Sequence, residues 1–291
     1  MIAPLVIAQL ILWTGSWRWA FVIIGLIGFA WLPLWLWFYR SPNDHWLMSD
    51  DEKKELEEDR QAGATVPASD AAQAHSTAQS PAKKQGLFAG WGVVLRYRQV
   101  WGVALIRFFS DSILWFYLAW LPKYFVDERG YSMEDIRNNL WMVFLPAIFA
   151  SFAGGGISGA LIRRGWSVNR ARKTVMFVSG VLMVSSMGVG MVESDVAALA
   201  LSSLALLSFY AYSTNTLTLP TDLASPGLVA SISGFSGMGA GLGSVLFTKL
   251  VGVIADQYSF TPVFVLVGIL PLLSMAALFF VTGPIKRVVN E

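Results

Sequence analysis

Seven long runs of apolar residues determine what this chain can fold into. They cover approximately residues 17–39, 100–122, 140–162, 174–192, 196–216, 229–254 and 261–281. Each is close to the roughly 20 residues that a helix needs to cross a hydrocarbon layer of about 30 Å. None alternates apolar and polar residues with a period of two, so helices rather than barrel strands are indicated. We therefore predict an all-α integral membrane protein.

The composition excludes several other classes of protein. Only 14% of the 291 residues are charged and 55% are hydrophobic, whereas soluble domains carry about 25% charged residues. The 13 Trp and 8 Tyr suit the two interfacial belts of a bilayer. Cysteine is absent, and His45 and His75 have no metal-ligand spacing around them. We predict no metal site, no cofactor and no nucleic-acid partner.

The chain begins with an apolar stretch that is too short to cross a membrane. Residues 2–13 are apolar apart from Gln9, and Thr14-Gly15 ends the run. As a helix it would reach only about 18–20 Å. It lacks the basic start and the small-residue cleavage site of a signal peptide. We interpret it as the second half of a helix whose first half is absent.

The segment 40–98 differs in kind from the spans. Residues 49–60 begin with a capping-box pattern and predict a short charged helix. Residues 61–86 are rich in Ala, Ser, Gln and Pro, which is typical of a flexible linker, and residues 87–98 are predicted to lie in the membrane interface. The predicted domains are residues 1–39 (half helix and one span), 40–98 (linker), 99–285 (a six-helix bundle) and 286–291 (tail).

The distribution of Lys and Arg predicts the orientation. The 40–98 loop, the 163–173 loop and the C-terminus together hold 15 of these residues, and the alternate connections hold four. Basic residues collect on the cytoplasmic side of a membrane. The long loop and the C-terminus are therefore predicted to be cytoplasmic.

Six stretches of the chain carry a family resemblance. They are MIAPLVIAQLILWTGSWRWAFVIIGLIGFAWLPLWLWFYRSP, RQVWGVALIRFF, WFYLAWLPKYF, RRGWSVNRARK, SGFSGMGAGLG and VGVIADQYSFTPVF. In these stretches the chain resembles the major facilitator superfamily, and within it the anion:cation symporters that carry sugar acids, hexuronate transporters especially. The resemblance covers essentially all of the chain outside the linker and would correspond to helix five (in part) through helix twelve of such a carrier.

The resemblance implies a function and a set of partners. It implies secondary transport of an organic anion, such as a hexuronate, by proton symport with alternating access in the inner membrane. The implied partners are the anion, the lipid bilayer and the missing N-terminal helices, where the family has its principal basic anchor and proton-coupling carboxylates. A non-transporting membrane remnant is the main alternative. A membrane-embedded enzyme is disfavoured because no nucleophile–base pair or metal site is evident.

One charged pair lies deep in a predicted span. Arg107 and Asp111 are four residues apart, hence on one helix face, and lie roughly 10 Å and 16 Å into the span. Charged groups at that depth must be paired or face water. The pair either binds a substrate carboxylate, with Asp111 orienting Arg107 or exchanging a proton, or locks helix packing.

Further polar and aromatic residues are candidates for the substrate site. Trp115 and Tyr117 could stack on a sugar ring, and Asn215 is the first choice within the polar cluster 212–216. For Asp222 we predict a helix-capping role at the cytoplasmic end, in preference to proton carriage. The predicted substrate-binding residues are thus Arg107, Asp111, Trp115, Tyr117 and Asn215.

Two further motifs concern packing and gating. Small residues let membrane helices approach closely, and the predicted packing glycines are Gly237, Gly239, Gly241 and Gly243. The cytoplasmic basic loop corresponds to the gating motif of the superfamily, and its predicted residues are Gly155, Arg163, Arg164, Arg172 and Lys173. That motif usually contains an acid, but Gly159 fills its position here, so the chain departs from the motif at the gate latch. Simple enforcement of orientation is the alternative role for these cations.

Overall fold

The structure is a computed structural model that describes residues 13–39, 95–224 and 226–285, together with five isolated positions, which are Val6, Leu10, Ser49, Lys54 and Gly92. Residues 2–86 and 87–291 form two separate compact units. The predictions for the charged helix, the linker and most of the interfacial segment lie outside the described residues. So do the predictions for most of residues 1–12 and for the tail 286–291.

The first unit contains the helix α2 (Trp17–Phe38). Its 22 residues correspond to a length of about 33 Å, enough to cross a hydrocarbon layer. The chain enters the helix through Gly15, whose φ of +66° is a conformation that glycine adopts without strain. Pro33 lies inside the helix, as transmembrane helices tolerate. The predicted span 17–39 is therefore present as one helix.

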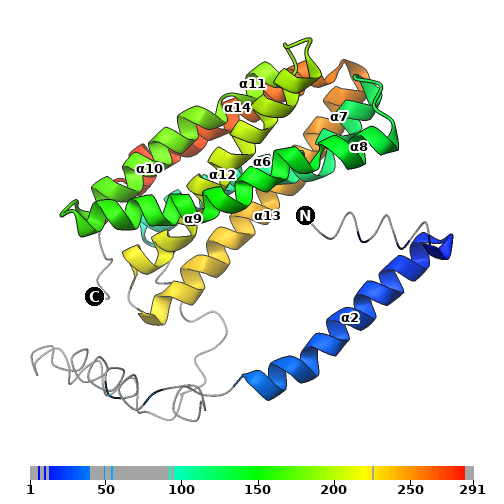
Figure 1. Cartoon of the computed structure of the whole chain (residues 1–291). Coiled ribbons are helices and arrows are strands. Elements are labelled where there is room, and N and C mark those ends of the chain that lie inside the picture. The colour runs from blue at the N-terminus through cyan, green and yellow to red at the C-terminus, as the bar shows by residue number, and fades with distance from the viewer. Residues whose placement is uncertain are drawn as a thin grey trace, which may run out of the picture. The chain divides into compact units, whose positions relative to one another are not determined.

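The second unit is a bundle of helices (Figure 1). Its elements are α6 (Arg98–Ala119), α7 (Leu121–Asp127), α8 (Met133–Asn139), α9 (Trp141–Arg163), α10 (Val168–Met183), α11 (Ser186–Val189), α12 (Asp195–Leu223), α13 (Pro226–Gln257), α14 (Phe260–Ala276) and the π-helical segment η2 (Ala277–Thr282). The described residues contain no strand. Six described helical stretches, α2 included, are long and apolar enough to cross a membrane. The all-α fold class is confirmed.

The predicted span 174–192 is not one continuous helix. α10 ends at Met183 and α11 starts at Ser186, and the two intervening amides bond carbonyl oxygens three residues back at 3.1 Å, which is the tighter 3₁₀ winding. Here Ser185 donates to a carbonyl oxygen of α12, and the Ser186 hydroxyl shares a 2.9 Å hydrogen bond with that of Tyr117. Two adjacent serines with partners on other helices explain the interruption, because such side chains compete with regular helix geometry.

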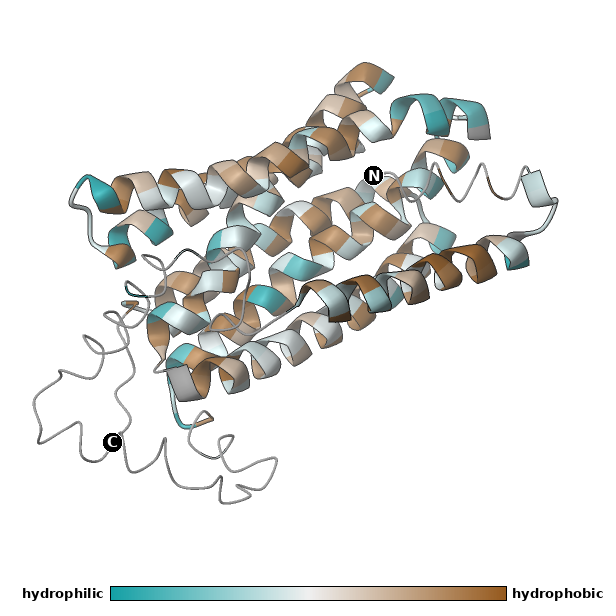
Figure 2. Cartoon of the chain, turned by 60° about the horizontal axis from the view of Figure 1, so that its bottom comes forward, coloured by the Kyte–Doolittle hydropathy of each residue, from teal (hydrophilic) through white to brown (hydrophobic). Residues whose placement is uncertain are grey.

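Hydrophilic residues collect at the ends of the bundle. Figure 2 shows long apolar and pale stretches along the helices, with hydrophilic colour at many of their ends and at a few positions between. Many large side chains on this apolar surface are exposed, for example Phe149, Phe152 and Phe280, which are 67%, 77% and 82% exposed. A surface of this kind is suited to contact with lipid.

The helices pack in two main pairs, α6 with α13 and α9 with α12. In the first pair, a β-carbon added at Gly239 would lie 2.7 Å from a backbone carbonyl oxygen of α6, and one added at Gly243 would overlap the carbonyl oxygen of Phe108. A β-carbon at Gly241 would meet no atom within 4 Å, and one at Gly237 would make an ordinary contact with Arg107. The close approach of α6 and α13 therefore rests on Gly239 and Gly243. For Gly237 and Gly241 the packing role stays a prediction.

We expect Gly243→Ala to destabilise the bundle, because the new methyl group would force the backbones of α6 and α13 apart. Overpacking of this kind costs about 1–3 kcal/mol. Thermal unfolding of the purified chain in detergent, followed by circular dichroism, would show a lower midpoint. Gly241→Ala is the matched control on the same helix and should leave the midpoint unchanged or raise it slightly. Equal losses in the two variants would contradict the assignment.

Candidate functional site: a charged stripe on α6 and an arginine network beside it

The charged pair predicted on α6 forms in the structure. The Nε and Nη2 atoms of Arg107 donate to Oδ2 of Asp111 at 3.1 and 3.0 Å. Ser110 donates to the other carboxylate oxygen at 3.2 Å, and Nη1 of Arg107 donates to the Ser236 hydroxyl of α13 at 3.3 Å. Both charged groups thus have hydrogen-bond partners within the protein, and Arg107 also ties α6 to α13.

This pair is not sealed inside the bundle. The side chains of Arg107 and Asp111 retain 18% and 16% exposure. Trp115 follows Asp111 by one turn on the same side of the helix and is 53% exposed. These three residues form a stripe of α6, which we call the α6 stripe, that the rest of the bundle does not fully cover. An arginine fork, an acid and an aromatic ring are the groups that bind a carboxylated sugar.

Tyr117 lies elsewhere. It is completely buried in the core, and its hydroxyl group bonds Ser186 at the interruption between α10 and α11. Lining a substrate pocket would require that hydrogen bond to break. The predicted substrate contact of Tyr117 therefore stays a prediction.

A second charged cluster connects α9, α10 and α12. Nε of Arg172 donates to Asp222 at 3.0 Å, and its Nη1 donates to the Ser158 hydroxyl at 3.1 Å and to Oδ1 of Asn215 at 3.3 Å. The Nδ2 atom of Asn215 donates to the carbonyl oxygens of Gly154 and Ala211, both at 3.0 Å. We call Arg172, Asp222, Ser158 and Asn215 the Arg172 network.

The Arg172 network changes the interpretation of two residues. Asn215 is fully buried, with both ends of its amide engaged, so in this structure it supports Arg172, and its predicted substrate contact stays untested. Asp222 pairs with Arg172, and its predicted capping role stays a prediction. Asp222 of α12 thus provides an acidic partner for Arg172, although Gly159 stands where the gating motif usually has its own acid. Sequence reasoning missed this pairing and the role of Ser158, although Ser158 directly precedes Gly159.

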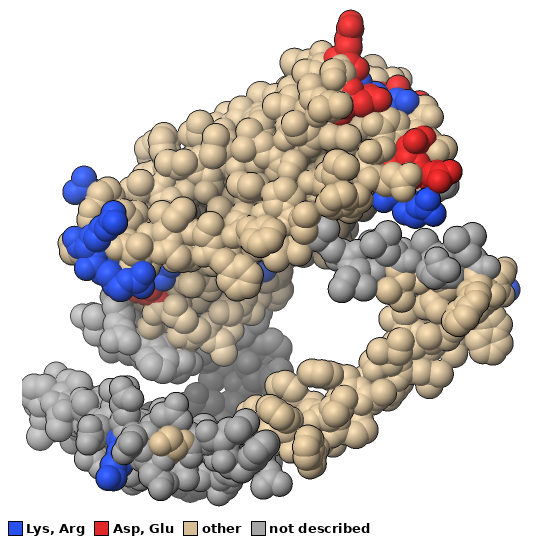
Figure 3. Space-filling view, in the orientation of Figure 1, with Lys and Arg blue, Asp and Glu red and all other residues tan. Residues whose placement is uncertain are grey.

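The other cations of the basic loop differ from Arg172. Arg163, Arg164, Arg170 and Lys173 form no ion pair with any residue that the structure describes. Figure 3 shows basic residues gathered where α9 and α10 meet, while acidic residues gather at the opposite end of the bundle. Gly155, the other predicted gating residue, lies on α9 against Thr214 of α12. The predicted gating roles of these residues stay predictions.

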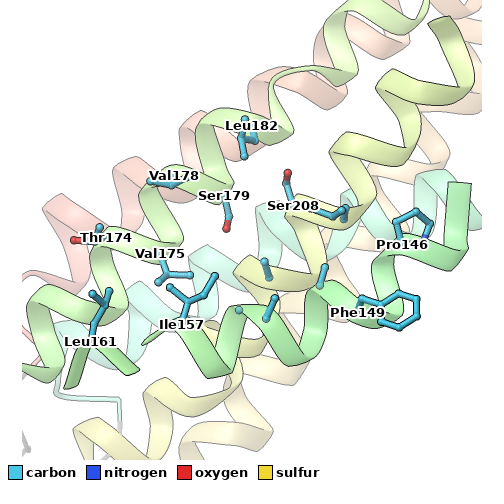
Figure 4. A pocket seen from close by; sticks show the side chains of 15 residues that line it. Pro146, Phe149, Ile157, Leu161, Thr174, Val175, Val178, Ser179, Leu182 and Ser208 are labelled. Atoms are coloured by element: carbon cyan, nitrogen blue, oxygen red, sulfur yellow. The ribbon is translucent and has the colours of Figure 1, made fainter. Parts of the chain in front are cut away.

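The bundle also contains an apolar groove of about 460 Å³ between α9, α10 and α12. Figure 4 shows Ile157, Leu161, Val175 and Val178 along it, with only hydroxyl groups such as that of Ser179 as polar neighbours. No charged side chain lines this groove. A site for an anion needs a cation or several donors, so the α6 stripe is the better candidate. The described residues also contain no group of side chains that could hold a metal ion.

Comparison with known proteins agrees with the resemblance seen in the sequence. The profile of the family described as Major Facilitator Superfamily matches residues 1–248. The chain is 31% identical over 286 residues to the hexuronate transporter of Escherichia coli strain K12, which covers 97% of this chain and 61% of that protein. The D-galactonate transporter of Escherichia coli O6:H1 is 28% identical over 94% of this chain and 61% of its own length. The hexuronate transporter of Bacillus subtilis is 27% identical over 93% and 59%. The chain thus spans about three fifths of the length of these relatives.

We expect Asp222→Ala to destabilise the inner packing of α9, α10 and α12, because it leaves Arg172 without its counter-charge. Breaking a fully buried pair costs about 3–5 kcal/mol. The side chains here keep 15% and 18% exposure, so about 2 kcal/mol is expected in chemical or thermal unfolding.

The control for this variant is Glu134→Ala. It breaks the Arg137–Glu134 pair, whose side chains are 52% and 73% exposed, and such surface pairs contribute about 0–1 kcal/mol. Adding Arg172→Leu to Asp222→Ala should recover part of the lost stability. Additive losses in the double variant would argue against a direct ion pair.

Proposed function

Because this chain belongs to the Major Facilitator Superfamily, we propose that it is part of a secondary transporter of small organic anions, and specifically of sugar acids. The relatives named as hexuronate and D-galactonate transporters support this substrate class, since hexuronates and galactonate are carboxylated sugars. The family consists of transporters rather than enzymes, which agrees with the absence of a recognisable catalytic constellation in the sequence.

The observation that carries the proposal is the α6 stripe. Arg107 sits well inside an apolar helix, where an unpaired cation is costly, and its fork presents five N–H donors. Within the described structure Nε, Nη1 and Nη2 each donate one hydrogen bond. Three of the five N–H groups are therefore used, and the remaining donors can bind a carboxylate. We propose that Arg107 binds the substrate carboxylate, Asp111 orients the guanidinium group, and Trp115 stacks on the sugar ring.

The coupling ion and the gate form part of the same proposal. Asp111 is a carboxylate near the middle of a span, a position typical of groups that exchange protons in transporters, and we propose proton symport. We propose that the Arg172 network braces the inward-facing end of the bundle and that its bonds rearrange as access alternates. Gly155, Arg163, Arg164 and Lys173 belong to this gate.

The arrangement in the membrane follows from the charges. We propose that the loop between α9 and α10, the segment 40–98 and the C-terminus lie in the cytoplasm, with the helices crossing the inner membrane. The predicted division into residues 1–39, 40–98, 99–285 and 286–291 belongs to this proposal. Since the relatives are longer, further helices of the same carrier are proposed to cover the α6 stripe and complete the substrate site.

The first test is binding of galacturonate and glucuronate to the carrier purified in detergent with those further helices present, measured by calorimetry. Arg107→Ala should weaken binding by about 10- to 150-fold, because hydrogen bonds to charged groups contribute about 1.5–3 kcal/mol. Arg137→Ala removes an exposed arginine of the same charge and should leave the affinity unchanged. Size-exclusion profiles would check that both variants remain folded. Equal affinities for Arg107→Ala and the unaltered chain would remove Arg107 from the site.

Uptake into proteoliposomes then separates transport from binding. A proton-coupled carrier should accumulate the sugar acid inside the vesicles when the outside is more acidic than the inside. This accumulation should disappear when the proton gradient is collapsed. Uptake that ignores the gradient would contradict proton symport. Binding without any flux would favour the alternative of a non-transporting membrane protein.

A further inference from the structure

A cavity of about 550 Å³ lies beside the first turns of α10, apart from the α6 stripe. Its polar wall is formed by Ser167, Asn169, Arg170 and Lys173, and its apolar wall by the rings of Phe177 and Phe279. Oδ1 of Asn169 accepts a 2.9 Å hydrogen bond from the amide of Ile285, just beyond η2. This bond ties the start of α10 to the segment just beyond η2.

The two cations of this cavity are positioned but not neutralised. The guanidinium group of Arg170 lies 4.3 Å from the centre of the Trp166 ring, and the ammonium group of Lys173 lies 5.0 Å from that of Phe279. Neither forms an ion pair with any residue in the described ranges. Cation–π contacts hold a charge in place without cancelling it, so both groups remain available to an anion.

The polar and apolar walls follow one another along the direction into the membrane. Arg170 and Lys173 occupy the first two turns of α10, where the chain leaves a loop, and Phe177 lies about one turn, roughly 6 Å, further in. Phe177 and Phe279 pack edge to face, with ring centres 6.1 Å apart, and are 49% and 40% exposed. The cavity therefore offers cations at the loop end of α10 and two partly exposed aromatic rings about one turn further along the helix.

We propose that this cavity binds an anionic phospholipid. Arg170 and Lys173 would donate hydrogen bonds to the phosphate oxygens, as charged donors do most strongly, with Ser167 beside the headgroup. An acyl chain would lie over Phe177 and Phe279. A soluble anion could use the cations but would leave the two rings exposed, and for this reason the lipid is favoured over a free phosphate ester.

The test is native mass spectrometry of the purified 291-residue chain, titrated in detergent with phosphatidylglycerol and with phosphatidylcholine of the same acyl composition. The chain should retain phosphatidylglycerol in preference. The double variant Arg170→Gln/Lys173→Gln should lose about 30-fold in affinity for it, since each cation near an anionic lipid contributes about fivefold.

The matched control is Arg163→Gln/Arg164→Gln. It removes the same charge from the same end of the bundle, but at positions that do not line the cavity, and affinity should change less than twofold. Equal losses in the two double variants would show general attraction to the basic end and overturn the proposal. So would an absence of preference for phosphatidylglycerol in the unaltered chain.

A further arm distinguishes lipid from a soluble phosphate. Phe177→Ser should weaken phosphatidylglycerol binding, because it removes the ring under the acyl chain, while glycerol 3-phosphate should fail to displace the lipid at millimolar concentration. Displacement by glycerol 3-phosphate together with an unchanged affinity of Phe177→Ser would assign the cavity to a soluble phosphate ester instead.

Discussion

Hydrocarbon offers a membrane-spanning segment no hydrogen bonds and little screening of charge, and the interior of this bundle is organised around that constraint. Two of its buried tyrosine hydroxyl groups find partners on other helices. Tyr117 bonds Ser186, and Tyr212 bonds Ser274, which itself donates to a carbonyl oxygen of α6. Such bonds specify which helix faces meet, because apolar contacts with lipid and with protein are nearly equivalent in this environment.

Arg107 and Arg172 satisfy the same constraint in different ways. Arg107 finds its acid one turn away on its own helix and reaches only a neutral serine on α13. Arg172 is held by groups from both α9 and α12. Replacing the acidic partner of Arg107 would affect a pair within one helix, whereas replacing the partners of Arg172 would remove polar contacts that connect three helices. The first geometry suits binding and release of a ligand, and the second suits a brace.

Sequence reasoning reached what is local along the chain and missed much of what is not. The spans follow from runs of apolar residues, and the Arg107–Asp111 pair follows from a spacing of four. The partner of Arg172 lies 50 residues away, so no helical period points to it. The interruption of α10 depends on hydrogen-bond partners in other helices, which hydropathy cannot register. Likewise Gly241 and Gly243 belong to one glycine pattern, and only the position of α6 separates the one in close contact from the one without neighbours.

The distribution of ion pairs connects the gate to the membrane surface. At the end formed by α7, α8 and the start of α12, the cations Lys123, Arg129 and Arg137 are each matched by an acid. At the other end Asp222 pairs with Arg172. Arg170 and Lys173, the sequence neighbours of Arg172, line the cavity beside η2. The segment proposed to hold the brace would therefore also be the segment proposed to face anionic headgroups. Because these residues share the first two turns of α10, a lipid that binds outside would restrict the same backbone that Arg172 ties down inside. The stability of the gate would then depend on the charge of the surrounding lipid.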